Sequence, residues 1–153
     1  MTIELSMLDK AHVVDGNTSV DEVISLMLKE KVSQIVVCDD GKQYLGMIEA
    51  REILTGLLPA SAKGPHGLQD LSFAGDATGL LTGNLNTLRK SNVKDIMNKE
   101  LPVLEEGGGM LEAALQVSQH DAPLPVVNEK GELLGLLGHR AIIASLSNGM
   151  GAS

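Results

Sequence analysis

The chain has 153 residues, a formal net charge of −8, 43% hydrophobic residues and 21% charged residues. This balance is typical of a globular protein with a substantial core. The negative charge argues against nucleic acid and anionic membranes as partners, because both are bound through clustered Lys and Arg. No apolar run approaches the roughly 20 residues of a membrane-spanning helix, and the N-terminus lacks the pattern of a signal peptide. The single cysteine, Cys38, cannot form an internal disulfide. We therefore expect a cytoplasmic protein.

Residues 3–54 are similar to residues 93–143 of the same chain. Equivalent residues are 90 positions apart up to Gly41 and Gly131, and 89 apart after a one-residue insertion at that turn. The likeness is greatest between Tyr44–Leu54 and Leu133–Ile143, which both have Gly at the third position and Arg at the expected start of a helix. A repeat of about 50 residues buries its apolar face poorly on its own, so we expect the two copies to pack together.

In the first copy, the pattern predicts a helical turn over Ile3–Met7 and a short strand at Val13-Val14. A helix follows Ser19, which has capping-box spacing to Glu22. Ile35–Cys38 then forms a strand, and a turn leads into an adjacent strand and a second helix that Pro59 ends.

The second copy repeats these signals in the same order. The sequence predicts a helical turn over Val93–Met97, a strand at Val103-Leu104, a helix after Gly109 and a strand over Leu124–Val127. The last helix is expected to end near Asn148-Gly149. The resulting division of the chain is repeat 1 over 1–58, a connecting segment over 59–91, repeat 2 over 92–148 and a flexible tail over 149–153.

The connecting segment is rich in Gly, Ser, Thr and Asn and is long for a loop inside one module. Leu81, Leu85 and Leu88 have helical spacing and predict a helix from about Gly79 to Arg89, whereas Gly64–Gly67 is expected to be a loop. The segment is either a surface insertion or an element that covers a ligand site or docks a partner. The sequence leaves both alternatives open.

Two tandem copies that end in Gly-hydrophobic-hydrophobic-X-X-Arg-X-hydrophobic resemble a pair of cystathionine-β-synthase (CBS) domains, the Bateman module. Val93–Met97, Leu124–Asn128 and Gly131–Gly135 are close to typical motifs of that family. The resemblance implies an α+β fold in which two β-α-β-β-α repeats pack through their sheets with pseudo-twofold symmetry. It also implies clefts between the repeats that bind adenosine-containing ligands, and pairing into homodimers.

The ligand motif of the family has Thr or Ser after the last strand and Asp three residues later, and this chain departs from it. Glu49 and Glu52 occupy these positions in repeat 1, and Gly138 and Ala141 occupy them in repeat 2. Glu52 can still accept hydrogen bonds from ribose hydroxyls, but Glu49 repels phosphate. In repeat 2, the His139-Arg140 pair matches the family and stands at a helix N-terminus, which favours phosphate.

The resemblance implies two sets of ligand-binding residues. One cleft would be lined by Met7, His12, Gln34, Glu49, Arg51 and Glu52, and the other by Met97, Pro102, Leu124, His139 and Arg140. Arg51 and Arg140 would bind phosphate or, alternatively, carboxylates of a neighbouring subunit. His139 falls on the apolar face of its predicted helix and would be either a phosphate donor or a packed side chain.

The favoured hypothesis is a regulatory module that binds AMP, ADP, ATP or S-adenosylmethionine between its repeats. The alternative is a structural or dimerisation module with degenerate, empty clefts, suggested by the missing Thr and Asp equivalents in repeat 2. The four histidines lack metal-ligand spacing, and Gly107–Gly109 lacks the Lys-Ser/Thr of a P-loop. We expect that the protein is not an enzyme and binds no metal, and the sequence assigns it no certain cofactor. We also expect neither nucleic acid nor membrane among the partners.

Overall fold

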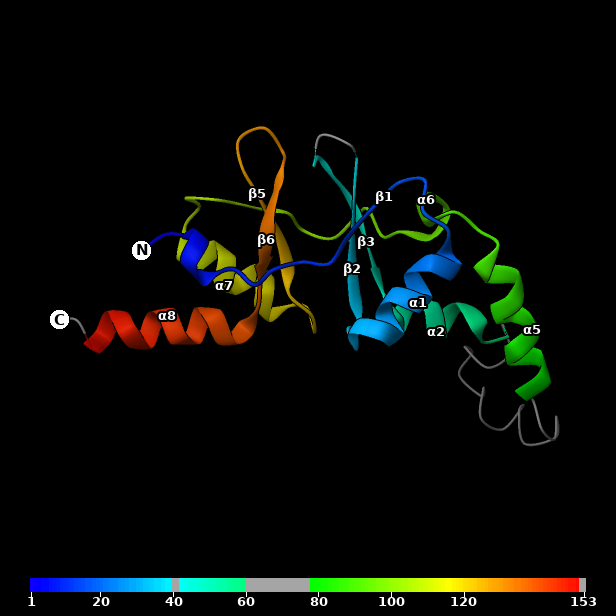
Figure 1. The fold of residues 1–153 in the computed structure, drawn as a ribbon. Coiled ribbons are helices and arrows are strands. Elements are labelled where there is room, and N and C mark those ends of the chain that lie inside the picture. Colours follow the sequence, from blue (N-terminus) through cyan, green and yellow to red (C-terminus); the bar gives the residue numbers. More distant parts are fainter. Residues whose placement is uncertain (40–41, 60–77, 152–153) are drawn as a thin grey trace. The chain divides into compact units, whose positions relative to one another are not determined.

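The computed structural model describes residues 1–39, 42–59 and 78–151 (Figure 1). Its elements follow the order predicted for both repeats. They are η1 (Leu5–Met7), β1 (Val13–Asp15), α1 (Val20–Glu30), β2 (Gln34–Cys38), β3 (Tyr44–Glu49), α2 (Ala50–Leu57), α5 (Thr78–Arg89), α6 (Val93–Ile96), β4 (Leu104–Glu105), α7 (Met110–Ser118), β5 (Leu124–Val127), β6 (Leu133–Leu137) and α8 (His139–Gly151). The expected loop over Gly64–Gly67, the turn residues 40–41 and the tail residues 152–153 lie outside the described residues.

Each repeat contributes one three-stranded sheet, in the order β1-β2-β3 or β4-β5-β6. The first two strands of each sheet are parallel, with Val13 opposite Val36 and Leu104 opposite Val126. A helix connects each parallel pair, since two parallel strands need a long crossover. β5 and β6 form an antiparallel hairpin, as the turn at Gly131 predicts. The α+β class and the β-α-β-β-α order are therefore confirmed.

The chain forms two compact units. Unit 1 comprises residues 1–15, 36–47 and 98–153, and unit 2 comprises residues 16–35 and 48–97. These units differ from the two repeats for two reasons. The opening segment of each repeat contacts the other repeat, and residues 36–47 of repeat 1 pack with repeat 2. In unit 1, the backbone N–H of Ile3 donates to the carbonyl of Gly108 (2.9 Å). In unit 2, the equivalent N–H of Val93 donates to the carbonyl of Thr18 (3.0 Å), so the exchange obeys the symmetry of the repeat.

The core of unit 1 joins residues of both repeats. One cluster surrounds Leu124, Val126 and Leu137, all fully buried, and includes Ile3 from the N-terminal segment. A second cluster packs Val36, Cys38 and Met47 of β2 and β3 against Leu136 of β6. The two sheets therefore share apolar side chains within unit 1, as the expected packing through the sheets requires.

The N-terminal segment is held on β6 by backbone pairing. Asp9 donates its N–H to the carbonyl of Leu136 (2.8 Å) and accepts from the N–H of Leu136 (2.9 Å). Gly135 makes this approach sterically feasible, because a Cβ there would lie 2.8 Å from the carbonyl oxygen of Asp9 and 2.9 Å from Cβ of Leu8. Gly135, at the third position of the repeated motif, thus permits close approach of another backbone.

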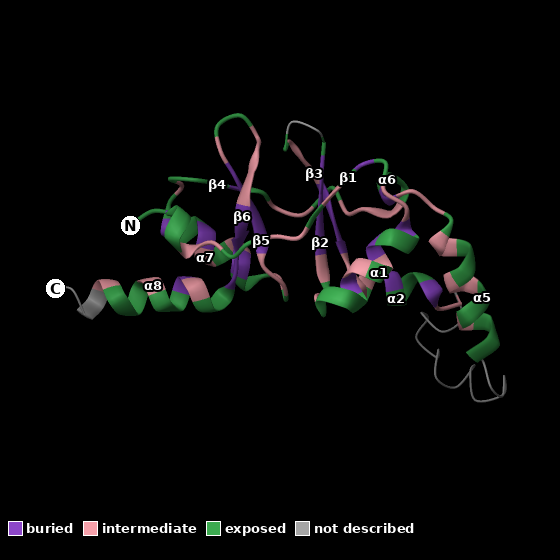
Figure 2. Ribbon diagram, in the orientation of Figure 1, coloured by how far each residue is buried: buried purple, intermediate pink, exposed green. Residues whose placement is uncertain are grey.

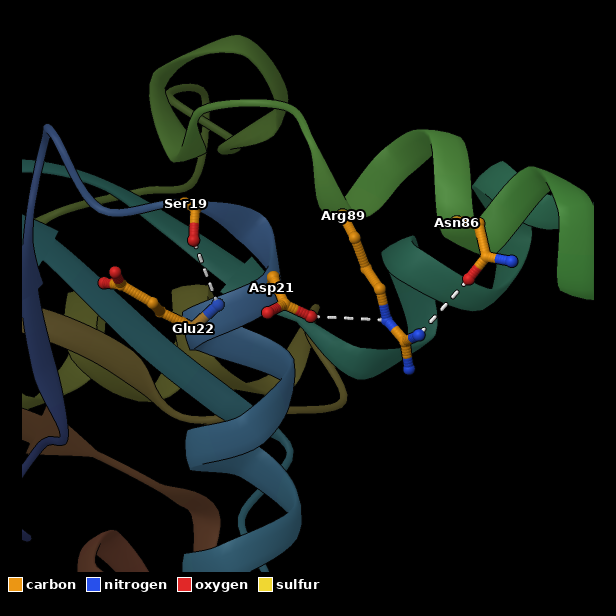
Figure 3. Close-up of polar contacts among 5 residues, drawn as sticks. All are labelled: Ser19, Asp21, Glu22, Asn86 and Arg89. Atoms are coloured by element: carbon orange, nitrogen blue, oxygen red, sulfur yellow. Dashed lines mark hydrogen bonds and ion pairs between the residues drawn. The ribbon is translucent and has the colours of Figure 1, made fainter.

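Unit 2 contains the helices α1, α2, α5 and α6. The α1 helix begins after Ser19, whose hydroxyl accepts from the N–H of Glu22 (3.2 Å; Figure 3), as the capping-box spacing predicts. The predicted helix in the connecting segment is also present, as α5, and it packs against α1 and α2. An ion pair of 3.4 Å joins Arg89 Nε of α5 to Asp21 Oδ1 of α1 (Figure 3).

The last helix differs from its prediction in length and in its buried face. α8 continues to Gly151, two residues beyond the expected end. Ile142 is buried, but His139, which was expected on the apolar face, is exposed because the first turn of α8 lies at the surface. Ile143 and Leu146 also stay largely exposed. No helix in the described part of the chain is long and apolar enough to cross a bilayer.

Candidate functional site

Three charged residues of the predicted site lie together in unit 2, where β3 leads into α2. Glu49 is the N-cap residue of α2 but makes no side-chain capping hydrogen bond. Its Oε2 lies 3.7 Å from Nη2 of Arg51, and the Arg51 side chain is 74% exposed against 12% for Glu49. An ion pair of this length with an exposed guanidinium contributes little to stability. Arg51 is therefore available to exchange the Glu49 carboxylate for another anion.

Glu52 lies one helical turn into α2 and is partly buried. Its pKa is raised above the ordinary value of 4.5 by burial first and by the negative charge of Glu49 second. Arg51 and a backbone hydrogen bond from Glu49 act in the opposite direction. That backbone bond is the return half of a capping box, with Glu at the third helical position. Glu52 is thus partly a structural residue of the helix terminus.

The Oε1 oxygen of the Glu52 carboxylate takes no part in the capping box. Oε1 of Glu52 is buried and has no hydrogen-bond partner among the described residues. Glu52 lines a small cavity of about 120 Å³ together with Ile48, Gly56, Leu88 and Ile96. A cavity of this size is well below the roughly 300 Å³ of ordinary ligand pockets. The oxygen is therefore a buried acceptor without a hydrogen-bond partner in the described part of the chain.

We expect Glu52→Gln to raise the free energy of unfolding at pH 7, because the amide removes a carboxylate that burial and Glu49 disfavour. The folded state binds the Glu52 proton more tightly than the unfolded state does, so the penalty for ionised Glu52 disappears as the pH falls below 4.5. The advantage of the variant should therefore shrink between pH 7 and pH 4, as measured by urea unfolding at both values.

Glu112→Gln is the matched control, because Glu112 occupies the same third position in α7 but is exposed. That variant should lose a few tenths of a kcal/mol at pH 7, since it removes a charge that favours the helix N-terminus. A Glu52→Gln variant less stable than the parent at pH 7 would contradict the conclusion that burial and Glu49 disfavour the ionised carboxylate.

The corresponding junction in unit 1 lies between β6 and α8. Gly138 is buried and takes the position of the family Thr, and a Cβ there would lie 3.4 Å from Cγ of Pro123. His139 and Arg140 follow in the first turn of α8 and are both exposed. Two exposed nitrogen donors at a helix N-terminus form a suitable place for an anion such as phosphate. Ala141 supplies no carboxylate for a ribose.

The other predicted residues are distributed over both units. Met7, His12, Pro102 and Leu124 belong to unit 1, with His139 and Arg140. Gln34 and Met97 belong to unit 2, with Glu49, Arg51 and Glu52. All are half-buried except the exposed Arg51, His139 and Arg140 and the fully buried Leu124. Leu124 is therefore a core residue in this structure, and its side chain is closed to solvent.

A cavity in unit 2 has no counterpart among the sequence predictions. It has a volume of about 530 Å³ and lies within unit 2 between α1, α2 and α5. Its wall is mainly aliphatic, including Met27, Leu54 and Leu85, and Lys31 and Arg89 add two cations. The helical spacing of Leu81, Leu85 and Leu88 indicated the existence of α5, but nothing in the sequence indicated which helices it would cover.

The thiol of Cys38 is protonated at neutral pH, and its pKa explains why. Burial, and secondarily the charge of Asp39, raises the pKa of the Cys38 thiol to about 11. A thiol with so high a pKa is a poor nucleophile at neutral pH. Among residues 1–39, 42–59 and 78–151, no group of three or more His, Cys, Asp or Glu is arranged to hold a metal ion.

The CBS domain family matches residues 3–59 and 93–148, which make up more than half of the chain. The chain therefore belongs to the CBS domain family and carries one CBS domain in each repeat. A curated relative is the chloroplastic CBS domain-containing protein CBSX2 of Arabidopsis thaliana, 26% identical over 129 residues. The match covers 82% of this chain and 54% of CBSX2, so the chain spans about half the length of that relative.

Solved structures show the same fold. The crystal structure of CBSX2 from Arabidopsis thaliana matches with a TM-score of 0.71 at 21% identity and covers 96% of this chain and 94% of that chain. A structure described as CBSX2 in complex with AMP matches with a TM-score of 0.65 at 22% identity and covers 96% of both chains. A CBS domain-containing protein of unknown function from Bacillus anthracis matches with a TM-score of 0.70 at 20% identity. The match covers 97% of this chain and 94% of that chain.

Proposed function

We propose that this chain is a regulatory module that binds an adenosine-type ligand, namely AMP, ADP, ATP or S-adenosylmethionine, between its two repeats. The observation that carries the proposal is the match over nearly the whole chain to the fold of CBSX2, which has been crystallised with AMP. The pair of strand-to-helix junctions, each with an arginine in the first turn of the helix, supports it from the residues of this chain.

Each junction would contribute ligand contacts to its own predicted cleft. Arg140 and His139 are exposed at the start of α8 and would donate hydrogen bonds to phosphate oxygens. Glu52 has an unsatisfied carboxylate oxygen that would accept a hydrogen bond from a ribose hydroxyl. Arg51 would release Glu49 to pair with a phosphate, at little cost given the 3.7 Å ion pair. The aliphatic residues of the predicted clefts would contact the base.

Regulation would follow from differential binding. A ligand that contacts both repeats favours the arrangement in which both sets of contacts are made, and a partner protein responds to that arrangement. In this proposal the chain binds a ligand and catalyses no reaction. The alternative, a structural module without ligand, is favoured by Gly138 and Ala141, which lack the hydroxyl and carboxylate of the family motif. This alternative predicts a protein whose stability does not change when nucleotides are added.

Thermal unfolding in the presence of each of the four ligands separates these functions. A ligand at 100 times its dissociation constant stabilises the folded state by about 2.7 kcal/mol. For a chain of this size, such a gain raises Tm by roughly 5–10 °C. We expect a shift of this order for at least one ligand at millimolar concentration. The absence of any shift for all four would favour the structural module.

Two variants localise the effect. Arg140→Ala should remove most of the shift for phosphate-bearing ligands, because it removes an exposed guanidinium at the α8 N-terminus. Lys29→Ala is the control, since Lys29 is an exposed cation in the last turn of α1 and belongs to neither predicted cleft. Equal shifts in both variants would contradict the proposed role of Arg140.

A further inference from the structure

The cavity between α1, α2 and α5 in unit 2 is large enough for a small organic ligand. Its volume of about 530 Å³ falls within the roughly 300–1,000 Å³ of ligand pockets. α5 packs on both other helices, yet none of its own residues is fully buried (Figure 2). None of the residues predicted to bind a nucleotide lines this cavity. It is therefore separate from the junctions considered above.

The wall of the cavity suits an alkyl chain. Nine of its twelve lining residues are Ala, Val, Ile, Leu or Met, and none is aromatic. A nucleobase would find no ring to stack on, whereas flexible aliphatic side chains pack well around a chain of methylene groups. Two of the lining side chains, Leu28 and Leu54, are 73% and 60% exposed. A bound alkyl chain would shield both from water, which is favourable.

The charged residues of the wall are all cationic. Lys31 at the end of α1 and Arg89 at the end of α5 line the cavity, and neither Asp nor Glu is among its lining residues. The chain as a whole carries a net charge of −8, so two cations without a carboxylate in the same wall stand out from its composition. An anionic group at this end of the cavity would be attracted by both.

Both cations have donors left for a ligand. Nε of Arg89 faces Asp21 at 3.4 Å without forming a hydrogen bond, and Nη1 donates to Oδ1 of Asn86 (3.2 Å). The remaining nitrogen of the guanidinium points away from both partners in Figure 3. Lys31 is exposed, and its ammonium has no ion-pair partner in the described part of the chain.

The internal repeat shows that this combination is particular to unit 2. Repeat 2 has Asp121 at the position of Lys31 and Ser118 at the position of Leu28. The third wall of the cavity is α5, which belongs to the connecting segment and lies outside the repeated pattern. The apolar wall and the two cations therefore do not follow from the CBS repeat itself.

We propose that this cavity binds a straight-chain carboxylate, the anion of a fatty acid. The alkyl chain would lie among the aliphatic side chains of α1, α2 and α5, and the carboxylate would accept charge-assisted hydrogen bonds from Lys31 and Arg89. The ligand would join α5 to the two helices on which it packs. The inference goes beyond nucleotide binding and holds whether or not the chain binds AMP.

Isothermal titration calorimetry with dodecanoate tests the proposal. The unchanged chain should bind dodecanoate saturably with a dissociation constant below about 1 mM. Decanoate and octanoate should bind more weakly, by about fourfold for each methylene group removed. Dodecyltrimethylammonium has the same alkyl chain with the opposite charge and should bind at least roughly tenfold more weakly than dodecanoate.

A matched pair of variants locates the site. Leu54→Glu and Ile143→Glu change side chains that are equivalent in the repeat and similarly exposed, and only Leu54 lines the cavity. Leu54→Glu should weaken dodecanoate binding by at least roughly tenfold, because it places a carboxylate beside the alkyl chain and the bound anion. Ile143→Glu should leave the affinity within about twofold. Circular dichroism checks that both variants are folded.

A second pair tests the charge without altering the apolar wall. Lys31→Glu should weaken dodecanoate binding by about fivefold or more, whereas Lys29→Glu, the same charge change at a residue outside the cavity, should leave it within about twofold. No saturable binding of dodecanoate at about 1 mM would overturn the proposal. So would equal affinity for the two dodecyl compounds, or equal losses within either pair of variants.

Discussion

Gly135→Ala is expected to lower the free energy of unfolding by about 2–4 kcal/mol, although it adds only one methyl group. A Cβ at this position would lie 2.8 Å from the carbonyl oxygen of Asp9 and 2.9 Å from Cβ of Leu8. Both atoms belong to a segment that two backbone hydrogen bonds, of 2.8 and 2.9 Å, fix to Leu136. The methyl group therefore separates the N-terminal segment from β6 instead of displacing a flexible side chain.

Urea unfolding measures the effect, and Gly83→Ala is the matched control. Gly83 lies within α5, and a Cβ there has no neighbour within 4 Å. That variant should gain about 0.5–1 kcal/mol, because Ala favours the helix and Gly opposes it. The two identical substitutions thus have opposite expected signs. A Gly135→Ala chain as stable as the parent would show that the N-terminal segment does not pair closely with β6.

Leu124→Ala is expected to cost about 3 kcal/mol of stability, within the usual range of 2–5 for a core leucine. Leu124 is fully buried in the cluster that joins Ile3, Leu104, Val126 and Leu137 in unit 1. Its loss leaves a cavity that rigid strands on both sides cannot fill. The expected cost is a large share of the roughly 5–15 kcal/mol that stabilises an ordinary domain.

Two further variants identify the cause. Leu124→Met conserves volume and should cost less than about 1.5 kcal/mol. Leu111→Ala removes the same atoms from a side chain 87% exposed, and should change stability by no more than about 0.5 kcal/mol. Because Leu124 was also predicted to line a ligand cleft, its stability effect bears on that prediction. A loss below about 1 kcal/mol would mean that its side chain is more accessible than the structure shows.

The secondary structure was largely predictable because its signals are local. Ser19 and Glu22 show the spacing of a helix start, and the structure places their capping hydrogen bond there. The apolar run Ile35–Cys38 predicts a buried strand, and all four residues are buried. Leu81, Leu85 and Leu88 predict α5 within one residue of its bounds. Each inference needed only neighbours within one or two turns of the chain.

The exchange of opening segments was not predictable in this way. Ile3 pairs with Gly108 and Val93 pairs with Thr18, contacts between residues far apart in the sequence. No periodicity within a segment specifies such a partner. The repeated glycine was the one available signal, since Gly135 is required where another backbone approaches. The sequence shows that the motif contains a glycine. The reason for the glycine became clear only from the position of Asp9 in the structure.

The residues of the candidate site stay a prediction, and the structure adds surroundings that the sequence did not indicate. Glu49 was expected to repel phosphate and Arg51 to attract it. The structure shows that the two side chains also pair with each other. Glu52 was assigned to a ribose, but its carboxylate also accepts from the backbone of Glu49. His139 was expected on an apolar face and is exposed, because the helix begins outside the core. Burial at helix ends depends on packing that the sequence pattern does not specify.

Isothermal titration calorimetry with AMP most directly tests the proposed binding of an adenosine-type ligand. The chain should bind AMP with saturable heat and a dissociation constant in the micromolar to millimolar range, and Arg140→Ala should weaken that binding by roughly tenfold or more, as expected for loss of a charge-assisted hydrogen bond. The Lys29→Ala control should bind as the unchanged chain does. Absence of heat with AMP, and likewise with ADP, ATP and S-adenosylmethionine at millimolar concentration, would contradict the account and leave a structural module.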